Sequence, residues 1–141
     1  MKVVYIETSA VLTWLLGEPD HQRVVDCLND SDMVVTSVLT RLEVERSLLR
    51  AERGGMMREA ERQKVRGLFA RVSSSWAFLA LSEDVLKRAS GAFPVEPVRS
   101  LDAIHRASAL EFLGLYPALS VLSFDKRIYD NLDPLGLPSA L

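Results

Sequence analysis

Cysteine is nearly missing from this chain of 141 residues, where Cys27 is the single example. One cysteine excludes an internal disulfide framework and fits the reducing cytosol, so we expect a cytoplasmic location. Long apolar runs are missing too, because none approaches the roughly 20 residues that cross a bilayer. The first residues also lack the basic region and apolar core of a signal peptide. We therefore expect no contact with a membrane.

A clear excess of either charge is also lacking. Lysine and arginine number 17 against 19 acids, for a net charge of −2. This balance argues against tight, nonspecific binding to nucleic acid that is driven by charge alone. It still allows an enzyme that meets nucleic acid locally through metal ions and a few arginines. Glycine-rich phosphate loops, metal-spaced Cys/His sets and the Gly-x-Ser-x-Gly elbow are absent as well.

What the chain does have is a regular alternation of apolar runs and amphipathic segments. Its composition, 48% apolar and 26% charged, is that of a globular protein, and its length suits one domain over residues 1–141. The run that ends at Glu7 is apolar throughout, which is typical of a parallel strand buried on both faces. Four short runs are expected strands: Val3–Ile6, Met33–Thr36, Trp76–Leu81 and Leu119–Phe124. The pattern predicts an α/β domain with a mostly parallel central sheet of about four to five strands, flanked by helices.

Helices are expected between and after these strands. The first should begin at Thr8 or Ser9 as N-cap and stop at Gly17. Ser100 is the expected N-cap of a helix that ends near Leu113. The other expected helices lie after Pro19, over Val38–Arg53, over Met56–Arg71, from Ser82 to Gly91, and after Asp125, before a loosely closing Pro134–Pro138.

Four acids lie directly after expected strands or in the first half of expected helices. Glu7 and Asp125 directly follow expected strands, Asp102 falls in the first turn of a helix, and Glu43 lies in the first half of another. Strand ends and helix starts of a parallel sheet share one edge, so these acids can meet there. Ligands that are all oxygen select hard ions such as Mg²⁺ or Mn²⁺, which activate water and neutralise a phosphodiester.

Each of these acids has a simpler interpretation when taken singly. A carboxylate in a first helical turn is favoured by the helix dipole, and most other acids are caps or solvated charges.

A helical wheel places Glu45, rather than Glu43, on one face with Val38, Leu42 and Leu49. The pattern alone therefore nominates Glu45 as the glutamate that faces the protein.

Four segments stand out in their order and spacing: Ile6–Ala10, Thr40–Val44, Arg99–His105 and Leu122–Asp125. Together they resemble the PIN-domain family, and the similarity to VapC toxins covers nearly the whole chain. The third segment, with its Asp-Ala-Ile-His, is the most specific. The resemblance implies a PIN-like fold and a metal-dependent endoribonuclease that cleaves phosphodiester bonds of single-stranded or structured RNA. It also implies a toxin–antitoxin system, with a cognate antitoxin as partner, and a homodimer.

The same resemblance implies the site residues. The catalytic and metal-binding acids are Glu7, Glu43, Asp102 and Asp125, with Mg²⁺ or Mn²⁺ as cofactor, and Glu43 is favoured over Glu45. Our hypothesis is that Glu7 and Asp102 bind the main ion directly. The other two acids complete its shell, or hold a second ion and orient the attacking water.

One position departs from the family pattern. Where the family has aspartate this chain has Glu7, whose carboxylate stands on a stem one methylene longer. Mg²⁺ needs nearly ideal octahedral geometry at about 2.0–2.1 Å, so the longer stem matters. The alternative hypothesis is therefore a catalytically silent PIN-like binding module. A third hypothesis is a phosphoacceptor signalling domain using Asp125 and Lys126, but it lacks the acidic pair at the first strand end.

Several further residues are candidates for contact with RNA or metal. Arg41 and Arg99 lie close in sequence to site acids, so they are the expected RNA contacts. Ser9 either joins them by hydrogen-bonding a metal-bound water or a neighbouring carboxylate, or it caps the first helix. His105 follows Asp102 by three residues, and we expect a hydrogen-bonded core histidine there rather than a ligand.

Three more arginines recur at helical spacing in the long helix over Val38–Arg53. They are Arg46, Arg50 and Arg53, and the same segment carries three glutamates. The expected arrangement is a solvated face on which these charges pair with each other.

Overall fold

Four parallel strands form a single sheet. In the computed structural model, which describes residues 1–141, they are β1 (Val3–Ile6), β2 (Met33–Ser37), β3 (Ala77–Leu79) and β4 (Ser120–Leu122). Their order across the sheet is β3-β2-β1-β4, and all three strand pairings are parallel. Val4 of β1 stands in register with Val34 of β2 on one side and with Ser120 of β4 on the other. The predicted parallel α/β sheet is confirmed.

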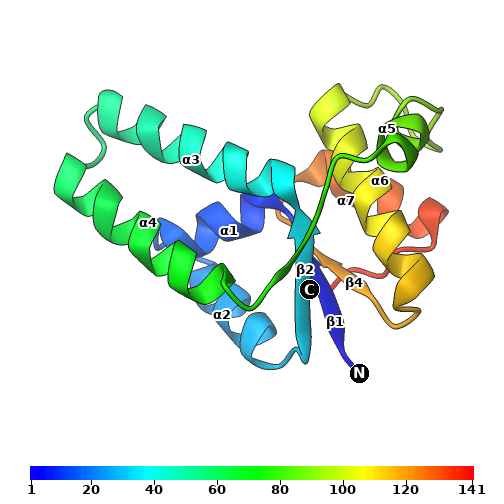
Figure 1. The fold of residues 1–141 in the computed structure, drawn as a ribbon, viewed down its shortest axis with the longest axis horizontal. Helices are drawn as coiled ribbons and strands as arrows, with labels where there is room; N and C mark the ends of the chain where they lie inside the picture. Colours follow the sequence, from blue (N-terminus) through cyan, green and yellow to red (C-terminus); the bar gives the residue numbers. More distant parts are fainter.

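Seven helices cover the two faces of the sheet. They are α1 (Thr8–Leu15), α2 (His21–Asn29), α3 (Val38–Arg53), α4 (Glu59–Ser73), α5 (Glu83–Ala89), α6 (Ser100–Leu115) and α7 (Lys126–Leu135). Figure 1 shows α1 to α4 on one side of the sheet and α5 to α7 on the other, with the α3–α4 pair reaching away from the body. No helix combines the length and apolar character needed to span a membrane.

The strand β1 explains why the layers form. Its four residues are each at most 1% exposed, and they alternate between two apolar clusters. Val4 and Ile6 pack with residues of α1 to α4, whereas Val3 and Tyr5 pack with residues of α6 and α7. Because successive strand residues point to opposite faces, an unbroken apolar run buries both faces at once.

The chain order of the strands locates the place where a site can form. The chain steps outward from β1 through β2 to β3, and then returns to place β4 on the other side of β1. Ligands of open α/β sheets bind beyond the carboxyl ends of the strands where the order reverses in this way. Glu7 follows β1 and Asp125 follows β4 by three residues, so both acids flank this reversal point.

Helix starts differ from the sequence predictions in two places. Glu7 itself is the N-cap of α1, because its side chain accepts a hydrogen bond from Ser9 N, so the expected caps Thr8 and Ser9 are wrong. Arg99, without a side-chain cap bond, precedes α6, and Ser100 is already helical. A strand-end carboxylate that reaches the next helix makes a separate hydroxyl cap unnecessary.

The buried face of α3 also differs from the one that the wheel predicts. Thr40, Val44 and Leu48 are fully buried, whereas Leu42 is 59% exposed. The predicted face was wrong because Leu42 lines an open cleft instead of the core.

The carboxyl-terminal segment is attached to the sheet and does not close the chain loosely. The helix α7 continues to Leu135 and ends at Gly136, whose φ of 74° suits glycine. Beyond it, Val121 N donates to Pro138 O at 2.7 Å and Ala140 N donates to Val121 O at 2.8 Å. These bonds cover the outer edge of β4.

Candidate active site

A cleft of about 770 Å³ opens at the carboxyl edge of the sheet and is lined by all four predicted acids. Glu7 follows β1, Glu43 lies on α3, Asp102 lies in the first turn of α6, and Asp125 caps α7. Four carboxylates from four separate elements therefore share one cleft. The remaining lining residues are Thr8, Ser9, Leu12, Leu39, Leu42, Arg46, Ser47, Arg50, Arg99, Ser100, Leu101 and Arg127.

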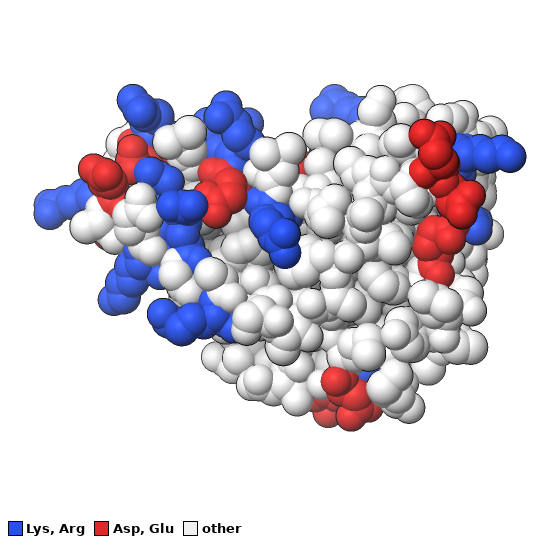
Figure 2. Space-filling model, in the orientation of Figure 1, with Lys and Arg blue, Asp and Glu red and all other residues white.

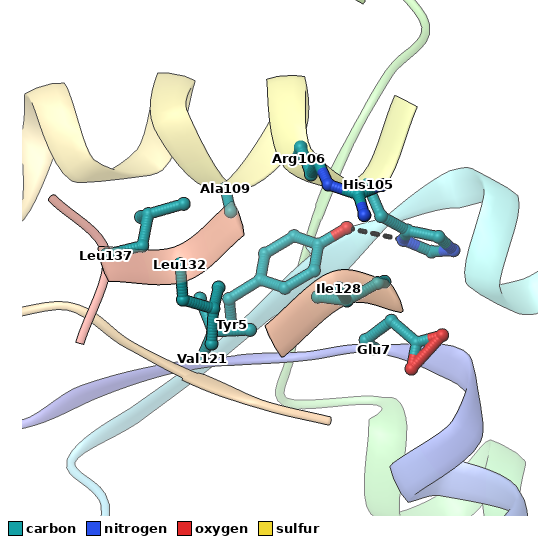
Figure 3. A pocket seen from close by; sticks show the side chains of 9 residues that line it. All are labelled: Tyr5, Glu7, His105, Arg106, Ala109, Val121, Ile128, Leu132 and Leu137. Atoms are coloured by element: carbon teal, nitrogen blue, oxygen red, sulfur yellow. Dashed lines mark hydrogen bonds between the residues drawn. The ribbon is translucent and has the colours of Figure 1, made fainter. Parts of the chain in front are cut away.

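Glu7 is held through one of its two carboxylate oxygens. Its Oε2 accepts hydrogen bonds from Ser9 N at 2.8 Å, from Ser123 Oγ at 3.0 Å and from Ser9 Oγ. Oε1 accepts no bond from the protein, which leaves it to the cleft. Figure 3 shows the carboxylate pointing away from a small apolar cavity behind it.

The environment of Glu7 disfavours its charged form. The side chain is almost fully buried, with 5% exposed. Burial raises the pKa of the Glu7 carboxyl above its usual value, although His105 and the hydrogen bonds from Ser9 and Ser123 act in the opposite direction.

Ser9 also ties β1 to the end of β4. While its side chain donates to Glu7, its Oγ accepts a hydrogen bond from Phe124 N at 2.9 Å. Ser9 therefore positions the acid that precedes it and the segment that leads to Asp125.

Glu43 is held by a buried relay that starts in the sheet. Its Oε1 accepts from His105 Nε2 at 2.6 Å and from Thr8 Oγ1 at 2.6 Å. His105 is only 2% exposed, and its Nδ1 lies 2.8 Å from the Tyr5 hydroxyl, as Figure 3 shows. An ionised Glu43 can only accept, so the proton of the Glu43–His105 contact lies on His105 Nε2. In the tautomer that carries its proton on Nε2, Nδ1 accepts from the Tyr5 hydroxyl, which burial keeps protonated by raising its pKa.

The relay keeps Glu43 charged. Burial acts to raise the pKa of Glu43, but the hydrogen bonds from His105 and Thr8 outweigh it, and the pKa lies below its ordinary value. The surroundings therefore shift the pKa values of Glu7 and Glu43 in opposite directions. The expectation of a hydrogen-bonded core histidine at His105 is confirmed.

Arg127 stands between the two aspartates. Its Nε lies 3.3 Å from Asp125 Oδ1 and 4.0 Å from Asp102 Oδ2. Asp125 Oδ1 also accepts from Arg127 N at 2.9 Å, which caps α7. The guanidinium therefore supplies positive charge between two acids that would otherwise repel each other.

A second cation, Arg106, lies buried behind the acids and was not identified from the sequence. It is 2% exposed, Nη2 donates to Arg127 O, and neither Nε nor Nη1 has a partner. Burial lowers the pKa of Arg106, while Asp102 and Asp125 act to raise it. The available signal was its spacing, because Arg106 follows Asp102 by four residues and so lies on the same side of α6.

The donor set fits a hard divalent ion in its chemistry. All four acidic side chains offer oxygen, and Glu7 and Glu43 each keep one carboxylate oxygen free of protein hydrogen bonds. As the side chains stand, no three His, Cys, Asp or Glu groups are arranged to hold one ion. Asp125 pairs with Arg127, and Glu43 is hydrogen-bonded to His105.

The remaining sequence candidates divide between the cleft and other surfaces. Arg99 and Ser9 line the cleft, whereas the Arg41 guanidinium stacks 4.0 Å from the centre of the Phe78 ring, outside it. Glu45, which the wheel nominates, pairs with Arg66 of α4 at 2.7 Å. The structure thus places Glu43 rather than Glu45 among the acids of the cleft.

Comparison with known proteins gives consistent matches. The family model of the PIN domain matches residues 4–132. Ribonuclease VapC46 of Mycobacterium tuberculosis strain H37Rv is 31% identical over 137 residues, which cover 97% of this chain and 95% of that protein. Ribonuclease VapC35 of the same strain is 26% identical, with 96% of this chain and 93% of that protein covered.

A solved structure extends the comparison to the fold. A chain of a toxin–antitoxin complex from Klebsiella pneumoniae superposes with a TM-score of 0.65 at 14% identity, covering 98% of both chains. At this identity the match supports the architecture alone.

Proposed function

The chain belongs to the PIN-domain family, and from that premise we propose that it is an endoribonuclease of the VapC toxin type. The observation that carries the proposal is the convergence of Glu7, Glu43, Asp102 and Asp125 on one cleft. The relatives named above are ribonucleases, and they match this chain over nearly its whole length. We further propose that residues 1–141 act as one catalytic domain.

The proposed cofactor is Mg²⁺ or Mn²⁺, held by Glu7, Asp102 and Asp125, with Glu43 as a further donor. Such an ion, when bound, supplies charge neutralisation at the scissile phosphate and makes a nearby water more acidic. Arg127 contacts the same two aspartates, so its positive charge would compete with such an ion for their oxygens.

The residues of the chain have separate tasks in this mechanism. Ser9 and Ser123 fix Glu7 by one oxygen, so that the other faces the cleft. The relay from Tyr5 through His105 fixes Glu43 and keeps it charged, so it can accept a hydrogen bond from the attacking water. The attacking water gives a proton to Glu43 as its oxygen bonds to phosphorus. The phosphorus–oxygen bond to the leaving nucleotide breaks, and the leaving oxygen takes up a proton.

Two partners belong to the proposal in addition to RNA. The first is a cognate antitoxin protein, because the Klebsiella pneumoniae structure that shares this fold is a toxin–antitoxin complex. The second is another copy of this chain, in the homodimer that the family resemblance implies. Ten large apolar side chains are exposed on the isolated chain, among them Leu42 at 59% and Leu101 at 49%, and both lie on the cleft. A cytoplasmic location completes the proposal.

The test is cleavage of a pooled single-stranded RNA with Mn²⁺ or Mg²⁺, with and without a chelator. We expect cutting by this chain that the chelator stops, and no cutting by Asp102→Asn. Unchanged turnover in Asp102→Asn would refute the acidic site. If only Glu7→Asp cuts, the silent binding module that Glu7 suggests is the better description.

A further inference from the structure

Three arginines of the cleft have no acidic partner. Arg46 and Arg50 stand on α3, Arg99 precedes α6, and all three side chains are exposed and line the cleft. None of them forms an ion pair, and the only recorded side-chain bond among them joins Arg50 to Ser47 at 3.3 Å. The fourth arginine of the cleft, Arg127, is already engaged by Asp102 and Asp125.

Many arginines elsewhere on the molecule are paired. Ion pairs join Arg23 to Asp20, Arg62 to Glu52, Arg66 to Glu45 and Arg88 to Glu111. Two of these pairs explain the unpaired arginines of α3. Glu45 and Glu52 belong to α3 but turn toward α4, so they leave Arg46 and Arg50 uncompensated. The face is exposed to solvent, as the sequence predicts, and Arg53 pairs with Glu52 at 3.9 Å. The predicted pairing is wrong only for Arg46 and Arg50.

Basic side chains are frequent on the α3–α4 pair. Figure 2 shows blue side chains over α3 and α4, at the left of the view, with fewer red ones between them. The net charge of −2 belongs to the whole chain, so it does not describe this local surface.

The spacing and chemistry of the arginines suit a phosphate backbone. Arg46 and Arg50 are four residues apart, which on a helix is a rise of about 6 Å, comparable with the spacing of neighbouring phosphates on an extended strand. Guanidinium groups bind phosphate oxygens through two parallel hydrogen bonds. The cleft lining contains no aromatic side chain, so it offers no platform on which bases can stack.

We propose that Arg46, Arg50 and Arg99 form a phosphate-binding track for a single RNA strand that crosses the acidic centre. The α3 pair binds the backbone on one side of the scissile bond, and Arg99, on the opposite wall beside Asp102, binds it on the other. Recognition along the track is therefore of the backbone, not of the bases. The inference rests on the proposed function, because it assigns the substrate contacts of that same cleft.

The experiment measures binding separately from cleavage. A labelled single-stranded RNA of 12 nucleotides is titrated by fluorescence anisotropy with Asp102→Asn, which prevents turnover, at several salt concentrations. In this background Arg46→Gln, Arg50→Gln and Arg99→Gln are tested singly and together. The matched control is Arg23→Gln, which removes the same charge from a different cavity near the amino end of β1.

We expect each cleft substitution to weaken binding by about 3- to 10-fold at low salt, and Arg23→Gln to leave it unchanged. The triple variant should reduce the slope of log affinity against log salt by about 2, since each phosphate contact on a single strand contributes about 0.7. Circular dichroism should show unaltered folding, because all four side chains are exposed.

Several results would overturn the track itself. One is an equal loss of binding in Arg23→Gln and the cleft variants, and the other is the absence of RNA binding by the parent protein. If the three substitutions abolish binding of poly-glutamate but spare RNA, the surface serves an acidic protein instead, which also overturns it.

The proposed function fails independently of the track. If wild-type protein cuts no RNA while binding depends on the three arginines, the track stands and the nuclease proposal falls. If wild-type protein cuts RNA while the arginine variants bind it normally, the track falls and the nuclease proposal stands.

Discussion

At the scale of single residues, the site is governed by what holds each carboxylate. Glu7 is buried behind two serines, whereas Glu43 receives hydrogen bonds from His105 and Thr8. Burial dominates at Glu7 and raises its pKa, while hydrogen bonding dominates at Glu43 and lowers its pKa. The same residue type therefore has opposite effects on stability at two places in one cleft.

Substitution of each glutamate by glutamine, with a chelator present, should change the melting temperature in opposite directions at neutral pH. A raised folded-state pKa means that Glu7 favours folding while it is protonated, and this contribution is lost as pH rises through that pKa. Glu7→Gln should therefore raise the melting temperature at pH 7 to 8, with a gain that shrinks below pH 4. A change of one in a pKa corresponds to about 1.4 kcal/mol.

Glu43→Gln should show the reverse. A lowered folded-state pKa stabilises the protein above the ordinary pKa of glutamate, and this contribution disappears as pH falls through the folded-state value. The variant should melt lower than wild type at pH 7 and approach it in acid. Differential scanning fluorimetry from pH 3 to pH 8 measures both variants, and parallel curves for the two would contradict the assigned environments.

The methylene that distinguishes glutamate from aspartate at position 7 should affect the rate. Ser9 and Ser123 hold Oε2 where the longer stem puts it. Glu7→Asp withdraws the carboxylate by about 1 Å, and displacements of that size can lower a rate by roughly 100-fold. We expect slower RNA cleavage by Glu7→Asp in a single-turnover assay. A faster variant would mean that the longer side chain impairs this site.

At the scale of elements, the orientation of the helix α3 differs most from what the sequence predicts. One side of it packs Thr40, Val44 and Leu48 into the core, while another exposes Leu42 and two arginines to the cleft. Ser37 fixes its start, since its Oγ accepts from Leu39 N at 3.1 Å. The position of Glu43 therefore depends on how α3 packs on the sheet.

Truncation of two leucines of α3 should separate its two sides. Leu48→Ala removes a fully buried side chain from the cluster that joins α3 to α1 and the sheet, so unfolding should become easier by about 2–5 kcal/mol. Leu42→Ala is the control, and because that side chain is 59% exposed its effect should stay within about 0.5 kcal/mol. Urea denaturation measures both, and similar losses would refute the assigned orientation of α3.

At the scale of the whole molecule, the fold brings distant carboxylates together and then balances them. Arg127 and the buried Arg106 supply positive charge where Asp102 and Asp125 approach each other. The proposed divalent ion would replace Arg127 as the positive charge beside the two aspartates. Binding of the ion would therefore change the stability of the folded protein.

Addition of Mn²⁺ should therefore stabilise the protein. An ion that binds only the folded state at 100 times its dissociation constant adds about 2.7 kcal/mol, which corresponds to several degrees in melting temperature. Asp102→Asn should reduce this gain strongly, whereas Asp26→Asn, on exposed α2, should retain it. A gain of the same size in Asp102→Asn would exclude the cleft as the binding site. The readout needs no RNA and no turnover.

The sequence by itself determined the layered α/β architecture. The apolar run Val3–Ile6 is buried on both faces, and a parallel sheet covered by helices is the structure that satisfies such a strand. Acids that follow strands or open helices must then meet at one edge. The motifs around Glu7, Glu43, Asp102 and Asp125 therefore sufficed to nominate residues that line a single cleft.

Only the tertiary structure decided which side chains face that cleft and what each one touches. Periodicity describes a helix by its own apolar face, but it does not say where the neighbouring elements end. For this reason the wheel selected Glu45, which pairs with α4, and the charge pattern predicted ion pairs for Arg46 and Arg50, which line the cleft without one. The roles of His105, Arg106 and Arg127 depend on contacts between residues far apart in the chain or on different elements, and such contacts exist only after the layers have packed.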